Sequence, residues 1–299
     1  MNNKTIIGII MTAILTLGFL LTSCRRDPKD GIYQPKKHLS NIIIGSNFSD
    51  TSAMQEWHWS DNLLRTIDFF SKPDHVLSLA STEHFFYEND RLTHIEMDKI
   101  KSEFTYDGDK LSQVVMTVLG EESMRFKLAY EKSKLSTITV SGLFDKKRQD
   151  LLAPLCRFMS QPIWLSLQHC SNMLARNTKD NDQIVIHLEW DGKNVSKAWT
   201  TGDDETLSFS FTYDKKINPF DGFFHCSFII NPYSIERPHL RNRNNVLTMT
   251  ATYAENSSLA AESETYRFEY TYDGDYPTSV TYPKSLTKSS SVVERYQYE

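Results

Sequence analysis

The sequence predicts a mainly β fold, a curled antiparallel sheet of repeated hairpins whose apolar face is covered by two short helices. Three features of the chain predict it: an aromatic and aliphatic repeat, strands in which apolar and polar residues alternate, and one segment with helical spacing. Alternation is typical of strands that bury one face, because successive side chains of a strand point to opposite sides. We therefore expect a single β-repeat domain over residues 41–299, with a helical insertion at 146–176.

The repeat is an aromatic residue, followed five positions later by an aliphatic residue or proline and eight positions later by Ile, Val or Ala. Polar or turn-forming residues lie between the first two positions, and several copies contain Asp-Gly. Asp-Gly between alternating strands favours a tight turn, because glycine readily adopts the positive φ that such turns need. Each copy is thus predicted to be one β-hairpin. The copies are Trp59/Leu64/Ile67, Tyr87/Leu92/Ile95, Tyr106/Leu111/Val114, Tyr130/Leu135/Ile138, Trp190/Val195/Ala198 and Tyr272/Pro277/Val280.

The strands that enter these turns have a two-residue period. Phe126, Leu128 and Tyr130 point one way, while Lys127 and Ala129 point the other. Burial of one large apolar side chain contributes about 1.5–3 kcal/mol. A whole row of them therefore has to be covered.

The cover is expected from residues 146–176, where apolar residues recur three and four positions apart, as on an amphipathic helix. Ser160-Gln161-Pro162 divides this segment, because proline interrupts helices. Two short helices are therefore predicted on the apolar face of the sheet.

Several motifs carry a resemblance to known families. The unit Phe104-Thr105-Tyr106-Asp107-Gly108-Asp109-Lys110-Leu111 resembles the YD repeat of large secreted bacterial surface proteins. Asn218-Pro219-Phe220, Arg243-Asn244-Asn245-Val246 and the stretch from Tyr272 to Val280 are similar to a family of uncharacterised Bacteroides-type lipoproteins built from such repeats. The likeness runs from about residue 57 to the C-terminus. It implies an exported β-repeat lipoprotein and supplies no catalytic residues.

The N-terminus has the layout of a lipoprotein leader. Lys4 precedes an apolar run at 5–21, which is shorter than the roughly 20 residues that a spanning helix needs. The run ends in Leu21-Thr22-Ser23-Cys24, which resembles a lipobox. We expect a signal peptide at 1–23, lipid on Cys24, a polar tether at 24–40, and an outer-membrane lipoprotein of the cell envelope. Periplasmic and surface display both stay open.

Composition narrows the partners. The chain has a formal net charge of −5, and nucleic-acid affinity rests on clustered Lys and Arg, so nucleic acid is excluded as a partner. Cys156, Cys170 and Cys226 are the cysteines besides Cys24, which allows at most one disulfide among them. Whether Cys156 and Cys170 are bonded stays open.

No catalytic motif stands out. The sequence contains no Gly-x-Ser-x-Gly, no His-Glu-x-x-His and no phosphate-binding glycine loop. His84 and His94 could meet across a hairpin, but a third zinc ligand is not evident. We expect no enzymatic activity, no cofactor and no metal.

A binding or scaffold role is therefore expected, with residues 218–245 as the surface for a protein or glycan partner. Aromatic residues with arginines around them dominate protein interfaces. The alternatives are a carrier of an apolar ligand, which a continuous apolar pocket would favour, and glycan binding by the outward-facing Trp199. The candidate partner-binding residues are Phe220, Phe223, Tyr233, Arg237, Arg241 and Arg243.

The lipobox generates the first test. Cys24→Ala removes the thiol that would be acylated, so the variant is expected to take up no radiolabelled palmitate and to leave the membrane fraction. Labelling that persists in the variant would show that the lipid is not on Cys24.

Overall fold

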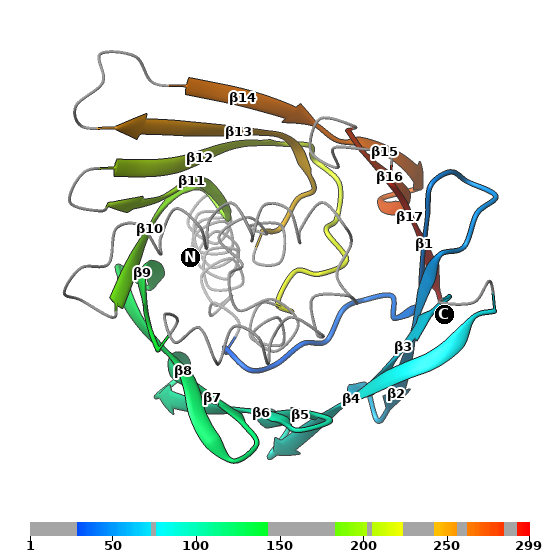
Figure 1. Cartoon of the computed structure of the whole chain (residues 1–299), viewed down its shortest axis with the longest axis horizontal. Helices are drawn as coiled ribbons and strands as arrows, with labels where there is room; N and C mark the ends of the chain where they lie inside the picture. The colour runs from blue at the N-terminus through cyan, green and yellow to red at the C-terminus, as the bar shows by residue number, and fades with distance from the viewer. Residues whose placement is uncertain are drawn as a thin grey trace, which may run out of the picture.

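The computed structural model describes residues 29–72, 76–142, 183–201, 205–223, 242–255, 262–283 and 292–299. Seventeen strands form one antiparallel sheet that curls into a nearly closed barrel (Figure 1). They are β1 (Leu39–Gly45), β2 (Ala53–Ser60), β3 (Leu63–Ser71), β4 (Ser78–Glu88), β5 (Arg91–Met97), β6 (Ile100–Asp107), β7 (Lys110–Val118), β8 (Glu121–Glu131), β9 (Lys134–Ser141), β10 (Gln183–Asp191), β11 (Asn194–Thr201), β12 (Glu205–Tyr213), β13 (Val246–Glu255), β14 (Glu262–Arg267), β15 (Glu269–Asp273), β16 (Tyr276–Tyr282) and β17 (Val292–Tyr298).

The mainly β, antiparallel prediction is confirmed, and the structure adds that the sheet closes on itself. The two helices predicted for 146–176 lie outside the described residues. In the described part of the chain there is no helix with the length and apolarity that a membrane crossing requires.

Strand order follows chain order around the barrel. Each strand from β2 to β13 pairs with the strand before it and the strand after it. The two ends of the chain also pair, because β17 lies antiparallel to β1 with Tyr298 opposite Leu39. The N-terminal and C-terminal strands therefore complete the wall together.

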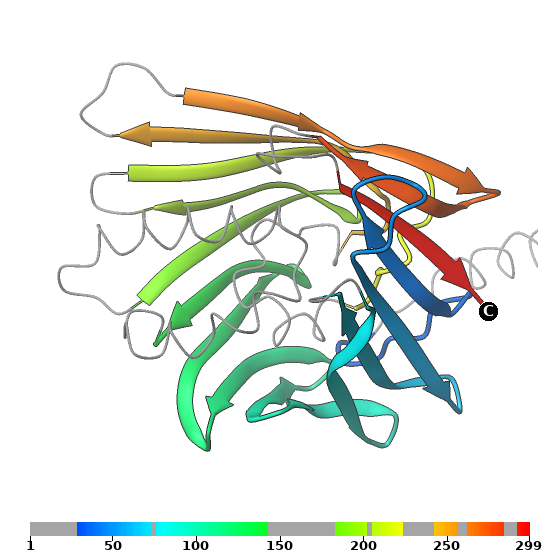
Figure 2. The same cartoon turned by 45° about the vertical axis from the view of Figure 1, so that its right-hand side comes forward.

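The wall has one discontinuity, which we call the seam. β14 pairs with β13, whereas β15, which follows it after Phe268, pairs with β16. Figure 2 shows β14 and β15 (orange) as two parts of one extended segment. The N–H of Phe268 donates to the carbonyl of Leu247 at 2.9 Å. The barrel is thus joined at the seam by the covalent chain rather than by a continuous hydrogen-bonded pairing.

All six repeat copies are hairpins, as predicted. In each copy the register shifts by one residue immediately before the aromatic residue, as at Thr105/Tyr106 and Ala129/Tyr130. Such a β-bulge increases the local twist of a strand and helps to curve a sheet. Gly108 takes the positive φ that the turn requires, 55°. Tyr213 and Val246 form a further copy in which residues 214–245 replace the tight turn.

The aromatic residues also bond to the neighbouring hairpin or strand. In most copies the hydroxyl or indole N–H donates a hydrogen bond to the backbone carbonyl of the aliphatic residue of the preceding copy, and Trp59 and Tyr298 make the same kind of bond where β1 and β17 meet; we call this series the aromatic ladder. The bonds are Trp59 to Leu39 (2.8 Å), Tyr87 to Leu64 (2.9 Å), Tyr106 to Leu92 (2.7 Å), Tyr130 to Leu111 (2.9 Å), Trp190 to Leu135 (2.7 Å), Tyr213 to Val195, and Tyr298 to Pro277 (2.8 Å). At the seam Tyr272 donates to the carboxylate of Asp214 instead.

The apolar face of the sheet is the inner face. Residues 29–38 (blue) and 214–223 (yellow) run inside the ring of strands (Figure 1), and Phe223 packs against Trp57 with ring centroids 5.0 Å apart. The opposite face carries Lys127 and Ala129, both exposed. The prediction of one buried and one solvated face is confirmed.

The aromatic ladder generates the second test. Tyr106→Phe removes the donor to the carbonyl of Leu92, and the loss of one hydrogen bond is expected to lower the free energy of unfolding by about 0.5–1.5 kcal/mol in denaturant melts. Thr139→Ala on the outer face is the control, with an expected change within about 0.5 kcal/mol. Equal losses in both variants would contradict a structural role for the ladder.

Candidate functional site

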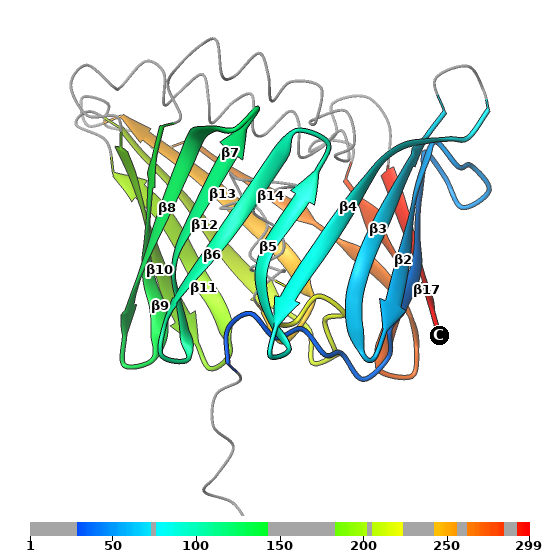
Figure 3. The ribbon, with the colours of Figure 1, turned by 90° about the horizontal axis from the view of Figure 1, so that it is seen from below.

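Two chain segments, residues 29–38 and 214–223, run along the inside of one rim of the barrel, and we call them the plug. Figure 3 shows both segments along the rim at which the repeat turns lie. Because the plug occupies part of this rim, the interior and the opposite rim are the places where a ligand site is sought.

The first plug segment is bonded to backbone atoms of the hairpin ends. The N–H of Asp30 donates to the carbonyl of Asp109 at 2.9 Å, and its carboxylate accepts from the N–H of Leu111 at 2.9 Å and from the hydroxyl of Tyr130 at 2.8 Å. The carbonyl of Gly31 accepts from the N–H of Leu92 at 2.9 Å. Exposed turn atoms thereby become partners for a segment that has no strand pairing of its own.

The two plug segments meet in an aromatic cluster. Tyr33 is 1% exposed, and its hydroxyl donates to the carbonyl of Pro219 at 2.6 Å. The ring of Tyr33 lies 5.1 Å from that of Phe223, and the ring of Phe220 lies 6.0 Å from that of Tyr296. The cluster seals the rim with apolar surface on its inner side.

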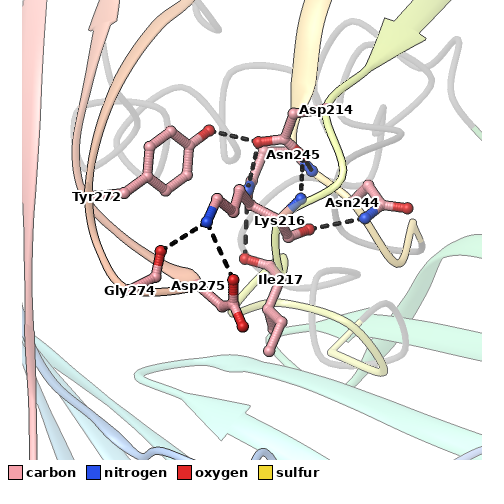
Figure 4. A network of polar contacts seen from close by, with 8 residues as sticks. All are labelled: Asp214, Lys216, Ile217, Asn244, Asn245, Tyr272, Gly274 and Asp275. Carbon is pink, nitrogen blue, oxygen red and sulfur yellow. Dashed lines mark hydrogen bonds and ion pairs between the residues drawn. The ribbon is translucent and has the colours of Figure 1, made fainter.

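The second plug segment is held by a polar network at the seam, drawn in Figure 4. Asp214 accepts hydrogen bonds from the backbone N–H of Asn245 at 3.0 Å and from the hydroxyl of Tyr272. The ammonium group of Lys216 donates to the carbonyl of Gly274 at 2.8 Å and lies 3.0 Å from a carboxylate oxygen of Asp275. Burial, together with the bond to Asp214, raises the pKa of Tyr272, so this phenol stays protonated and donates.

Two residues of the expected partner-binding surface lie in the core of the structure. Phe220 and Phe223 are 9% and 3% exposed, so they pack in the plug and cannot serve as exposed anchors. Arg243 is exposed. Tyr233, Arg237 and Arg241 lie outside the described residues, as does Cys24. Sequence alone does not distinguish a loop that folds into a barrel from one that stays on its surface.

The expected tether at 24–40 also needs correction. Its residues from 29 onward belong to the barrel, and Leu39 is already in β1. The polar composition that suggested a free tether is explained by the turn atoms that these residues bind.

The barrel interior contains an isolated acid. Glu83 on β4 is fully buried and lies between Ile67 and Met97 of the neighbouring strands. No described residue donates a hydrogen bond to either of its carboxylate oxygens, and burial raises the pKa of Glu83 well above its ordinary value. Glu83 shares the face of Phe85, which is the alternation signal that could have found it in the sequence.

Two buried serines extend this polar feature. Ser102 on β6 is 0% exposed and Ser123 on β8 is 3% exposed. Neither hydroxyl has a partner among the described residues. We call Glu83, Ser102 and Ser123 the inner polar strip, since they are buried polar side chains on strands of the inner face that have no hydrogen-bond partner among the described residues.

Among the described residues, one group of side chains with metal-ligand chemistry lies on the outer face. Glu56, His58 and Asp68 offer three ligand atoms within 4.8 Å of one another, a set that could hold a divalent cation. The imidazole of His58 lies 3.0 Å from one oxygen of Asp68, and the hydroxyl of Thr82 donates to the other at 2.6 Å. These bonds satisfy Asp68 without an ion.

The two histidines considered from the sequence, His84 and His94, have different neighbours on the paired strand. His84 lies opposite Glu96, whereas His94 lies opposite Phe86 and stacks on its ring at 4.3 Å. Burial, followed by the charge of Lys101, lowers the pKa of His94. Among the described residues, neither histidine belongs to a group of three possible metal ligands.

Comparison with known proteins supports the fold alone. No model of a known protein family matches the chain, and no curated protein matches its sequence. A porin-like protein from Bacteroides uniformis is similar in structure, with a TM-score of 0.50 and 11% identity over 91% of this chain and 100% of that chain. A porin-like protein from Bacteroides vulgatus gives a TM-score of 0.35 and 9% identity over 88% of this chain and 99% of that chain.

The isolated acid generates the third test. Because the pKa of Glu83 is raised in the folded state above its ordinary value of 4.5, its contribution to stability is fully present below that value. The contribution is lost as pH rises through the raised pKa. Glu83→Gln is therefore expected to gain stability relative to the wild type as pH increases, measured by denaturant melts between about pH 4 and 8.

The matched control is Glu131→Gln, which changes an exposed glutamate at a hairpin end. Its difference from the wild type should stay small and nearly constant over the same pH range. A constant difference for Glu83→Gln as well would mean that Glu83 is not held in a strongly desolvated state.

Proposed function

We propose that this protein is a non-catalytic, lipid-anchored binding protein of the cell envelope that carries an apolar ligand inside its barrel. The observation that carries the proposal is the polarity of the wall. Its inner face is apolar and contains an inner polar strip without partners, while its outer face is polar. The inner face is therefore the part of the wall whose chemistry suits an apolar ligand.

The size of the barrel supports this role. Side chains can fill the interior of a barrel of roughly eight strands, but wider barrels leave space that other material has to occupy. With seventeen strands, the wall needs filling beyond its own side chains. The plug accounts for one end. Apolar residues such as Leu111, Val114 and Met116 line the wall and are 0% exposed, so they are already covered within the chain, and a ligand that replaced part of this cover would have to be apolar too.

The porin-like description of the structural neighbour is not carried over to this chain as a pore. Strands that face lipid turn apolar side chains outward and polar ones inward. Here Glu103 and Lys127 are exposed on the outer face, and Phe104 and Leu128 are buried on the inner one. The neighbour supports a barrel shape, and the polarity of the wall supports a water-exposed outer surface.

A lipid on Cys24 would also orient the barrel. Lys29 begins the plug at the turn rim, and five residues span at most about 18 Å. The plugged rim would then face the membrane, with the opposite rim directed away from it. A ligand would enter through the rim that is remote from the membrane.

A second candidate, glycan binding, has one observation in its favour. Trp199 lies on the outer face beside His187, with the rings stacked at 5.1 Å, and the ammonium group of Lys197 lies 5.2 Å from the Trp199 ring. The Trp199 side chain is thus held in position by its contacts with His187 and Lys197. Loss of glycan retention in Trp199→Ala, with ligand uptake by the interior unchanged, would favour this second function.

The unlipidated mature chain provides the test of the carrier function. The neutral dye N-phenyl-1-naphthylamine is expected to bind saturably with increased fluorescence, and dodecanol should displace it. Dodecanol at about one hundred times its dissociation constant should also raise the free energy of unfolding by about 2.7 kcal/mol, because it binds the folded state only. Absence of both effects would show that the chain fills its own interior, which would leave a scaffold role.

A further inference from the structure

The seam leaves one strand of the wall with an unpaired edge. We propose that β14 is a docking site for an extended, cationic segment of a partner protein, which adds to the sheet as a further antiparallel strand. This interaction surface is separate from the barrel interior and does not depend on the proposed carrier function.

The pairing of β14 is one-sided. Its six residues, Glu262–Arg267, pair with β13, and no described strand pairs with them on the other side. Figure 2 shows β14 (orange) along the margin of the sheet. An unpaired edge of this kind is a template for a strand from another chain.

A proline explains why the wall does not cover this edge. β16 sets Thr281 opposite Glu269 of β15 and ends at Tyr282. Continuing this register would bring Pro283 opposite Arg267, and proline has no N–H to donate. The hydrogen-bonded ladder between the two segments therefore stops where β14 meets β15.

The direction of the backbone decides which groups are available to a partner. In an antiparallel pair, the N–H and C=O of one residue point to the same neighbouring strand, and those of the next residue point to the opposite side. The N–H of Phe268 donates to the carbonyl of Leu247 in β13 at 2.9 Å. By alternation, the backbone groups of Ser263, Thr265 and Arg267 point away from β13. These three donors and three acceptors have no partner among the described residues.

The edge is exposed and already ordered. All described side chains of β14 except that of Tyr266 are exposed. On the outer face the hydroxyls of Thr265 and Thr250 lie 2.9 Å apart, as do those of Ser263 and Thr252. These bonds hold β14 on β13, so a partner strand would bind a preformed template and lose little affinity to ordering of the site.

The charge of the edge indicates the partner. Residues 262–269 contain three glutamates and one arginine, and at the same rim Glu205 pairs with Glu255 across β12 and β13. A strand that places lysine or arginine opposite Glu264 would form a cross-strand ion pair and meet a complementary potential. A second copy of this chain would bring an equally acidic edge, which like-charge repulsion disfavours.

The test measures the binding of a fluorescent heptapeptide of alternating threonine and lysine to the unlipidated mature chain by anisotropy. Saturable binding is expected. With lysine opposite Glu264, the threonines of the peptide exchange hydrogen bonds with Ser263, Thr265 and Arg267. N-methylation of the threonines should therefore weaken binding at least about tenfold, because several hydrogen bonds are lost. N-methylation of the lysines is the matched control and should change binding by less than about threefold.

Two variants place the peptide on β14. Thr265→Pro removes an edge donor that takes no part in the pairing with β13, and proline is tolerated at such positions, so the fold is expected to persist while binding weakens at least about tenfold. Thr265→Ala loses the same hydroxyl but keeps the N–H, so its binding should stay within about threefold of the wild type. If Thr265→Pro fails to fold, the two N-methylated peptides still decide the question on the wild-type chain.

Each contrary result overturns a defined part of the proposal. Equal binding of the two N-methylated peptides excludes strand addition, and unchanged binding by Thr265→Pro excludes β14 as the site. A peptide of alternating threonine and glutamate that binds as tightly as the lysine peptide excludes a cationic partner. Sedimentation that shows a wild-type dimer and a Thr265→Pro monomer assigns the edge to a second copy. Absence of binding by the lysine peptide overturns the docking site.

Discussion

The aromatic ladder is the interaction on which the rest of this architecture depends. Except at the seam, where Tyr272 bonds to Asp214, each aromatic residue lies near the end of one strand and donates a hydrogen bond to a backbone carbonyl of the neighbouring hairpin or strand, so neighbouring hairpins are fixed in register as well as paired. Register matters because a slip by one residue exchanges the two faces of a strand. The bulge before each aromatic residue adds twist at the same level of every hairpin. Repetition of both features around the wall curves the sheet until its ends meet.

The plug depends on the ladder. The hydroxyl of Tyr130 reaches both the carbonyl of Leu111 and the carboxylate of Asp30, so one side chain serves the wall and the plug. Gly31 packs so closely that an added Cβ would lie 2.3 Å from the hydroxyl of Tyr106, and its φ is +87°. Glycine is required there on both grounds. The rim and the plug therefore have to form as one unit.

The polarity of the wall is the reverse of that in barrels whose outer face contacts lipid. The outer face carries polar side chains, and the apolar inner face is buried. Within that interior Glu83, which has no hydrogen-bond partner among the described residues, lowers the stability of the fold in a way that packing alone does not offset. Buried, unsatisfied polar groups are uncommon in folded proteins and call for an explanation in strain or in ligand binding. The proposed function therefore rests on the polarity of the wall rather than on the exposed loops.

The sequence alone determined the features that depend on residues close together in the chain. Turn residues and the two-residue period define the six hairpins and their faces, because both act over a few residues. Alternation also places Glu83 on the buried face. The lipid on Cys24 and the helices at 146–176 remain predictions from sequence.

Only the tertiary structure decided closure, the plug and the burial of Phe220 and Phe223. These depend on residues far apart in the chain: Tyr33 bonds to Pro219, Asp30 to Tyr130, and β1 pairs with β17. No local sequence pattern encodes such contacts. Before the wall curves, water satisfies the hydrogen-bonding groups of both residues about equally well, and only the curved wall brings the two residues together. The polar composition of residues 29–38 by itself predicts a tether. The segment becomes part of the barrel because it forms hydrogen bonds with backbone atoms at the ends of the hairpins.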